Sequence, residues 1–349
     1  MKIGNRDIGP GHPPLVIAEM SGNHNRSLER ALAIVDAAAR AGAHALKLQT
    51  YTADTITLDC QRSEFMISPQ ASNPWAGKSL HQLYQEAYTP WEWHEPIFAR
   101  ARQLGMEAFS TPFDETAVDF LESLDVPCYK VASFENNDIP LLRRVAATGK
   151  PLIISTGMAT VAELDEMVSA VRGAGCREVV LLKCTSNYPA APNNTNLRTI
   201  PHLRQLFSCE VGLSDHTMGV GAAIAAVALG ATVIEKHFTL SRADGGVDAS
   251  FSMEPDEMTS LVVESERAWQ AMGEIKYGPT EGERGSLVYR RSLYLVSDMK
   301  AGDLLSVDNV RSVRPGLGMS PKFLEQVLGM QIKKDAIRGM PLTWDLLKP

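Results

Sequence analysis

The sequence lacks the features that mark several classes of protein. Its five cysteines are odd in number and scattered, with no C-x-x-C pair, which argues against a disulfide framework and favours reduced thiols. The longest apolar stretch, residues 220–234, is interrupted by glycine and too short to span a bilayer. The N-terminus has no apolar segment followed by a cleavage site, so no signal peptide is predicted. We therefore expect a cytoplasmic protein.

The chain also lacks a surplus of positive charge. Lysine and arginine number 34 against 41 aspartates and glutamates, a net charge of −7, which argues against nonspecific nucleic-acid binding. The net charge does not exclude a small anionic substrate, because a few local cations are enough to bind one. With 44% hydrophobic and 21% charged residues, the composition is that of a globular protein. The 349 residues exceed one compact core, so we expect a large domain and a small one.

Short apolar runs alternate with amphipathic helical stretches along most of the chain. In the clearest helix, residues 27–43, Ser27 can cap the start, and an apolar stripe is formed by Leu28, Leu32, Val35 and Ala39. Alternation of this kind predicts parallel strands, and eight units in about 270 residues match a (β/α)8 TIM barrel. An open doubly wound sheet is the alternative, but the first turn lacks G-x-G-x-x-G. The predicted strands are residues 15–20, 45–50, 107–112, 128–133, 151–157, 178–184, 210–215 and 232–238.

Composition changes after Met272. We predict a catalytic barrel over residues 1–272, a Gly/Glu/Lys-rich linker over 273–288 and a second domain over 289–349 with short strands and turns. A domain of about 60 residues is small for an independent core, so docking on the barrel or on a partner chain would stabilise it. The longest insertion, residues 51–90, is expected to form a loop with some helix over the barrel mouth.

Every predicted strand carries polar residues at its C-terminal end, where barrel enzymes place their active sites. Singly, each has a structural explanation: a hydroxyl caps a helix, a lysine extends to water, and a histidine bonds in the core. Together they point to one mouth. Lys47 and Lys130 would form a cup of cations and hydroxyls, suited to a phosphate or carboxylate. The hydroxyls of this cup are Thr111, Ser133, Ser155 and Ser214.

Two histidines end neighbouring strands. Neutral imidazoles at His216 and His237 could bind a divalent metal and leave positions open for substrate and water. Glu19, on a strand beside the last one in a closed barrel, could act as a general base. Strand alternation places Glu235 on the same inner face as His237, whereas Lys236 would face the helices and form a salt bridge.

Several stretches along the chain match those of a known family. They include "IAEMSGNHNRSLERA", "FSTPFD", "YKVASFENNDIPL", "ISTGMAT", "LLKCTSNYP", "GLSDHTMG", "IEKHFTLSRADGGVDASFSMEP" and "VRPGLGMS". In these stretches the chain resembles the sialic acid synthase family, and within it the pseudaminic acid branch. The resemblance implies a (β/α)8 barrel followed by an antifreeze-like (SAF, β-clip) domain, in a domain-swapped homodimer where each tail caps the partner's barrel. It implies condensation of phosphoenolpyruvate with an N-acetylated sugar aldehyde, and a divalent metal, Mn²⁺ or Mg²⁺, with Co²⁺ as a further candidate.

The same resemblance implies roles for individual residues. Glu19 matches the proposed catalytic carboxylate, and His216 and His237 match the metal ligands. Arg314 matches an arginine that the tail inserts into the partner's site to hold the sugar. The matches to phosphoenolpyruvate contacts are Lys47, Thr111, Lys130, Ser133, Ser155 and Ser214. The matches to the sugar-binding positions are Gln49, Ser186, Asn187, Tyr188, Asp248 and Arg314.

The branch within the family rests on two loops. Ser186 in "CTSNYP" stands where neuraminate synthases have asparagine, and "SRADGGVDASFS" also differs from the neuraminate-type loop. Both resemble the pseudaminic branch, whose acceptor is 2,4-diacetamido-2,4,6-trideoxy-L-altrose and whose phosphate leaves by C–O cleavage. The alternatives are the same chemistry on N-acetylmannosamine or a legionaminic precursor, a Schiff-base aldolase, or a tail that binds a glycan or ice. The destination of the product, whether flagellin, capsule or lipopolysaccharide, stays open.

Overall fold

The computed structural model describes residues 1–68 and 75–348. The chain divides into two compact units, Met1–Gly273 and Glu274–Pro349, which are described separately below. No helix in the described ranges is both long and apolar enough to cross a membrane.

The first unit is a closed barrel of parallel strands, so the predicted (β/α)8 fold is confirmed. The last strand pairs with the first as well as with its predecessor, which excludes the open sheet. All eight strands are buried along their whole length or at all but one residue, in agreement with the apolar runs of the sequence. The strands are β3 (Leu15–Glu19), β4 (Ala45–Thr50), β5 (Glu107–Pro112), β6 (Tyr129–Val131), β7 (Leu152–Ser155), β8 (Val179–Cys184), β9 (Glu210–Ser214) and β10 (Val233–His237).

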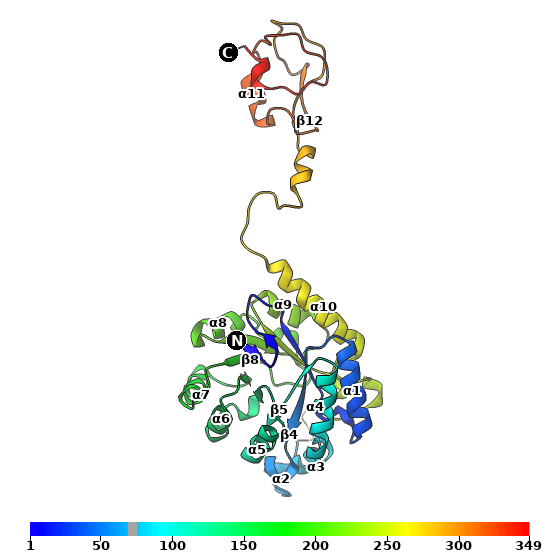
Figure 1. The fold of residues 1–349 in the computed structure, drawn as a ribbon, viewed down its shortest axis with the longest axis vertical. Helices are drawn as coiled ribbons and strands as arrows, with labels where there is room; N and C mark the ends of the chain where they lie inside the picture. The colour runs from blue at the N-terminus through cyan, green and yellow to red at the C-terminus, as the bar shows by residue number, and fades with distance from the viewer. Residues whose placement is uncertain (69–74, 349) are drawn as a thin grey trace. The chain divides into compact units, whose positions relative to one another are not determined.

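Helices surround the strands (Figure 1). In α1 (Leu28–Arg40) the predicted cap is present, because the Ser27 side chain accepts a hydrogen bond from the backbone nitrogen of Arg30. The face that packs on the barrel centres on Ile34 and Val35. The other members of the predicted stripe, Leu28, Leu32 and Ala39, are only half-buried. The others are α4 (His94–Gln103), α5 (Glu115–Ser123), α6 (Ile139–Ala146), α7 (Val161–Gly173), α8 (Thr199–Phe207), α9 (Gly221–Ala228) and α10 (Pro255–Met272).

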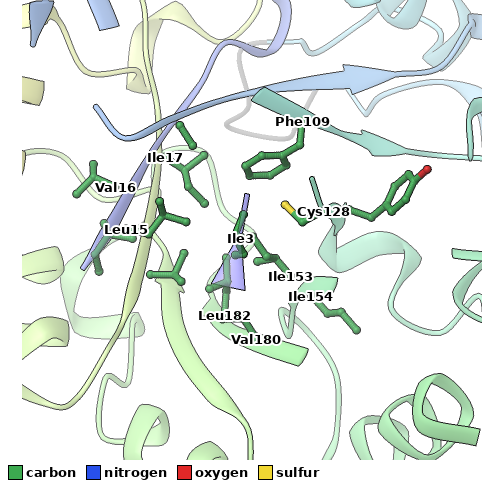
Figure 2. Close-up of a cluster of buried hydrophobic side chains, with 14 of the residues drawn as sticks. Ile3, Leu15, Val16, Ile17, Phe109, Cys128, Ile153, Ile154, Val180 and Leu182 are labelled. Carbon is green, nitrogen blue, oxygen red and sulfur yellow. The ribbon is translucent and has the colours of Figure 1, made fainter. Parts of the chain in front are cut away.

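A short hairpin closes the N-terminal end of the barrel. Strands β1 (Lys2–Ile3) and β2 (Arg6–Asp7) are joined by a two-residue turn that places Gly4 at φ +57°, a conformation that glycine adopts without strain. The next backbone nitrogen donates to a carboxylate oxygen of Glu107, the first residue of β5. Figure 2 shows Ile3, which is fully buried, among side chains of the barrel strands. The mouth at the other end is therefore the open one.

The 51–90 insertion follows β4 at the mouth. Its described residues include the short α-helices α2 (Ala53–Ile56) and α3 (Leu80–Ala87) and the 3₁₀ turn η2 (Ser63–Phe65), in agreement with the helix predicted there. Residues 69–74 of the insertion lie outside the described residues.

The second unit has its own small core. Strands β11 (Ser292–Leu295) and β12 (Val310–Val313) pair antiparallel, and α11 (Leu324–Val327) is a single turn of helix. The predicted short strands and absence of a long helix are confirmed within the described part of the unit. Its buried apolar residues include Leu293, Leu295, Val310, Val327, Ile332 and Leu342.

One glycine is required by strand packing. A methyl group added at Gly212 of β9 would overlap the carbonyl oxygen of Val233 and the side chain of Leu182. We expect Gly212→Ala to destabilise the first unit by about 3 kcal/mol or more, because backbone cannot yield as a side chain does. Thermal denaturation should show a midpoint lowered by roughly 6 °C or more. Gly11→Ala is the matched control, since nothing lies within 4 Å of its added methyl. Equal midpoints for the two variants would contradict the prediction.

Candidate active site

A buried lysine and a buried carboxylate meet at the ends of β3 and β4. The strand register pairs Glu19 with Lys47, and Lys47 Nζ lies 2.8 Å from Glu19 Oε2. The same ammonium group donates to Thr111 Oγ1 on β5 at 3.1 Å. Gln49, two residues along β4, donates to Glu19 Oε1 at 2.9 Å. Three adjacent strands thus supply one continuous hydrogen-bonded set.

Glu235 connects this set to a second lysine across the barrel. One oxygen of its carboxylate lies 3.9 Å from Lys47 Nζ and 3.8 Å from Lys130 Nζ. It also accepts a hydrogen bond from Ser214 Oγ at 3.2 Å. Lys130 in turn donates to Ser155 Oγ at 2.6 Å. We call these charged and hydroxyl groups the lysine cup. Its members, all buried, are Glu19, Lys47, Thr111, Lys130, Ser155, Ser214 and Glu235.

Burial and the neighbouring charges act against each other in the cup. Burial alone would raise the pKa of Glu235, but Lys130 and Lys47 outweigh it and lower this pKa. Burial would lower the pKa of Lys47, yet the charges of Glu19 and Glu235 raise it. For Lys130 burial prevails and its pKa is lowered. Lys130 is therefore the cation that gains most from an anionic ligand.

The two predicted histidines lie side by side at the mouth. His216 follows β9 and His237 ends β10, with their ring centroids 5.4 Å apart. His216 Nδ1 donates to the carbonyl oxygen of Thr185 at 3.0 Å, which leaves the Nε2 lone pair available. His237 Nδ1 is buried without a hydrogen bond, 3.8 Å from an oxygen of Asp248. Burial lowers the pKa of His237 well below its usual range, so the ring is neutral.

These residues fit a divalent metal with an open coordination sphere. Neutral imidazole is the metal-binding form of histidine, and His237 is in this form. For His216, burial would lower the pKa, but the nearby Cys184 and Glu235 raise it. Within the residues that the structure describes, no group of three or more His, Cys, Asp or Glu side chains is placed to hold an ion. The remaining ligands would therefore be oxygens of substrate or water.

Loops after the first and last strands are bound to each other beside the histidines. In the 3₁₀ turn η1 (Ser21–His24), Ser21 donates to Asp248 from a backbone at φ +48°, an unusual value for a side-chain-bearing residue. Asn23 donates to the carbonyl of Phe238 at 2.9 Å and to Ser252 Oγ at 2.8 Å. These contacts hold the Asp248 carboxylate near His237.

The predicted sugar-binding residues are brought together only in part. Gln49 and Asp248 lie at the mouth as described, and the Tyr188 ring centroid is 4.5 Å from that of His216. Ser186 Oγ lies 3.8 Å from Cys184 Sγ. The Asn187 side chain is exposed and makes no hydrogen bond to the described residues. Arg314 is exposed in the second unit, directly after β12, so barrel residues alone do not complete the predicted set.

Ser133, a predicted member of the cup, is buried and bonds to the loop after β7. Its hydroxyl accepts a hydrogen bond from the backbone nitrogen of Gly157 at 3.1 Å. Because a methyl added at Gly157 would overlap Ser133 and Ser186, glycine is needed for this close approach.

The salt bridge predicted for Lys236 is present on the helix side of the barrel. Its ammonium lies 2.8 Å from Asp215, and both side chains are 1% exposed. It also donates to the carbonyl oxygens of Thr217 and Gly219. Lys236 therefore fixes the segment that carries His216.

Sequence reasoning did not single out Glu135 or Cys184. Glu135 ends the 3₁₀ turn η4 (Ser133–Glu135), and its buried Oε2 has no hydrogen-bond partner. Burial raises the pKa of Glu135 to about 7, with Lys130 opposing. Cys184 Sγ lies 3.9 Å from His216 Nδ1. Glu135 could have been found from the sequence, because it lies two positions after the predicted site residue Ser133 in "SFENND".

Glu135 makes stability depend on pH. A carboxyl group whose folded-state pKa is raised stabilises the fold below its ordinary pKa of 4.5, and that stability is lost as pH rises toward 7. The free energy of unfolding of Glu135→Gln should match that of the parent protein near pH 5 and exceed it by about 2–3 kcal/mol at pH 8. Denaturation of both proteins at pH 5, 6.5 and 8 checks this. A difference that stays constant across these pH values would refute it.

Known proteins share both the sequence and the fold. The NeuB family profile matches residues 34–277, and the SAF domain profile matches residues 290–348. A pseudaminic acid synthase of Campylobacter jejuni is 43% identical, with 96% of both chains covered. An N,N'-diacetyllegionaminic acid synthase of the same organism is 34% identical, covering 90% of this chain and 94% of its own.

Among solved structures, an N-acetylneuraminic acid synthetase of Leptospira borgpetersenii in complex with citrate superposes with a TM-score of 0.73. It is 31% identical and covers 83% of this chain and 95% of its own. Family profile, sequence identity and barrel fold agree across nearly the whole length. This chain therefore belongs to the NeuB family of sialic acid synthases and carries a C-terminal SAF domain.

Proposed function

We propose that this protein is a pseudaminic acid synthase, which condenses phosphoenolpyruvate with 2,4-diacetamido-2,4,6-trideoxy-L-altrose. The observation that carries the proposal is the pair of buried histidines beside a buried cup of two lysines and several hydroxyls. The cup suits an anionic phosphate ester, and the histidines suit a metal that meets an aldehyde oxygen. The greater identity to a pseudaminic than to a legionaminic relative, 43% against 34%, supports the choice of sugar.

The charges of the cup explain why a metal belongs in this site. Lys47 and Lys130 are balanced by Glu19 and Glu235, so the four side chains carry no net charge. Phosphoenolpyruvate carries a carboxylate and a phosphate and needs further positive charge when water is excluded. A divalent ion on His216 and His237, Mn²⁺ or Mg²⁺, would supply that charge and act as a Lewis acid toward the sugar aldehyde.

The side chains of the cup then have separate tasks. Lys130, with Ser155, holds the phosphate or carboxylate of phosphoenolpyruvate, while Lys47 and Thr111 fix the other end. Carbon 3 of phosphoenolpyruvate forms a bond to the aldehyde carbon, and positive charge develops at carbon 2. Lysine-bound oxygens compensate for charge as it moves toward the departing phosphate.

Glu19 is the proposed proton acceptor. Water adds to carbon 2 and transfers a proton to the Glu19 carboxylate, and this proton passes to the alkoxide left on the former aldehyde carbon. The bond between carbon 2 and the phosphate oxygen then breaks to leave a ketone, and the hydroxyl proton leaves with the phosphate. Gln49 and Lys47 hold the two oxygens of Glu19 in place, and burial raises its pKa, which improves it as a base.

We also propose that the site is completed by a second copy of the chain. Large apolar side chains are exposed after three strands at the mouth: Phe134 by 59%, Met158 by 64% and Met218 by 50%. Such a rim favours a covering partner. Arg314, which has no hydrogen bond or ion pair among the described residues, is proposed to enter from the partner's tail and hold the acceptor. The five free cysteines suit a reducing, cytoplasmic location.

A direct assay tests the reaction. Phosphoenolpyruvate and Mn²⁺ are supplied with the diacetamido altrose, N-acetylmannosamine or the legionaminic precursor, and phosphate release is followed. We expect the first sugar to have the highest kcat/KM and EDTA to abolish turnover. In ¹⁸O-labelled water the label should enter the new keto acid and be absent from phosphate. Label in phosphate alone would contradict C–O cleavage. Turnover that persists in EDTA, together with a covalent enzyme–substrate adduct trapped by borohydride, would instead favour the Schiff-base aldolase.

Mixed dimers test the proposed exchange of tails. Arg314→Ala removes the tail's contribution, and Lys130→Met disables the barrel, so each variant alone should lose at least about 100-fold in kcat. Co-expression with two affinity tags isolates the mixed dimer. If tails are exchanged, one barrel with Lys130 receives an intact tail, and about half the parental activity should return. Inactive mixed dimers, or a monomer by light scattering, would exclude the exchange.

A further inference from the structure

An aromatic wall extends outward from the histidine pair. Tyr188 has its ring centroid 4.5 Å from that of His216, and Phe251 has its centroid 5.0 Å from that of His237. The two rings touch each other with centroids 5.3 Å apart. Trp75 forms the outer end, 5.7 Å from Tyr188 and 6.4 Å from Phe251. We call Trp75, Tyr188 and Phe251 the aromatic wall.

Trp75 reaches this position from the 51–90 insertion. Its indole nitrogen donates to the carbonyl oxygen of Val247 at 2.8 Å, across 172 positions of sequence. Val247 precedes Asp248, whose carboxylate accepts from Ser21 beside the histidines. The insertion is therefore joined to the loop after β10 at the point where that loop carries a predicted sugar-binding residue.

The polarity of the site changes along this wall. Lysines, carboxylates and hydroxyls line the cup, whereas the wall beside the histidines consists of aromatic rings. The aldehyde end of the acceptor must reach phosphoenolpyruvate in the cup. The far end of the sugar chain then lies along the wall, toward Trp75. Ring faces favour C–H groups and a methyl over a hydroxyl, which would lose hydrogen bonds to water there.

We propose that Trp75 determines acceptor specificity by packing its indole against the methyl end of a 6-deoxy sugar. This inference rests on the proposed function, because it assigns the part of the site that meets the end of the acceptor farthest from the reacting carbon. The bond to Val247 holds the indole in register with the rest of the wall. Trp75 acts as a positioning residue and takes no part in bond making.

The test compares two acceptors that differ at one carbon. The diacetamido trideoxy altrose and its counterpart with a C6 hydroxyl are assayed with the parent protein, Trp75→Ala and Trp75→Phe. Trp75→Ala should lower kcat/KM for the deoxy sugar about 10- to 100-fold, mainly through KM, and change the hydroxylated sugar by less than about threefold. Trp75→Phe should retain most of the preference. Where turnover is undetectable, inhibition constants give the same ratio.

Leu58→Ala is the matched control, because Leu58 is an exposed apolar residue of the same insertion and is 64% exposed. This variant should leave kcat/KM for both acceptors, and the KM for phosphoenolpyruvate, unchanged. Equal losses on both acceptors in Trp75→Ala, or a raised KM for phosphoenolpyruvate, would show a structural role and overturn the inference. If the parent protein prefers a hydroxylated acceptor from the start, the proposed sugar fails. If the parent prefers the deoxy sugar and Trp75→Ala keeps that preference, only the role of Trp75 fails.

Discussion

Four charged side chains buried at the centre of the barrel mouth constrain the rest of this structure. Transfer of charge out of water costs far more than one hydrogen bond returns, so such groups must be paired. Lys47, Lys130, Glu19 and Glu235 meet this requirement only together, since Glu235 lies within 4 Å of both lysines. They come from four strands, and the first and last strands must pair to bring Glu19 and Glu235 together. The buried charges are therefore balanced only when the barrel is closed.

The same balance shapes the proposed chemistry. A cup with a surplus of cations would bind many phosphate esters without help. A neutral cup binds a trianion well only when positive charge arrives with it or from outside, which is what a metal on the histidines and an arginine from another chain would provide. Because burial keeps His237 neutral, this ring adds no charge before a metal binds. Substrate affinity and assembly of the complete site are then coupled.

The strands could be predicted from sequence because each is a short apolar run that ends in polar residues. Six of the eight predicted runs match the observed strands to within one residue at each end, and alternation correctly separated Glu235 and His237 from Lys236. Alternation placed Glu235 only on the inner face; its position between two lysines is a contact across the barrel that periodicity cannot give. The position of Trp75 could not be predicted for a similar reason, because its partners lie more than a hundred residues away in the sequence.

Strand ends and loops differ in how far the sequence determines which side chains meet. Strand ends have fixed spacing and direction, so residue type and position nearly determine what meets in the cup. Loops have no such rule, and their side chains find partners only after the chain has closed. Here the loop after β3 is bound to the loop after β10 through Asn23, and the insertion reaches that same loop through Trp75. The predicted reacting groups thus lie on barrel strands, while the surface proposed to meet the far end of the sugar is assembled from loops that fix one another. A change of acceptor can then follow from changes in the loops without disturbing the buried charges, which tolerate little alteration.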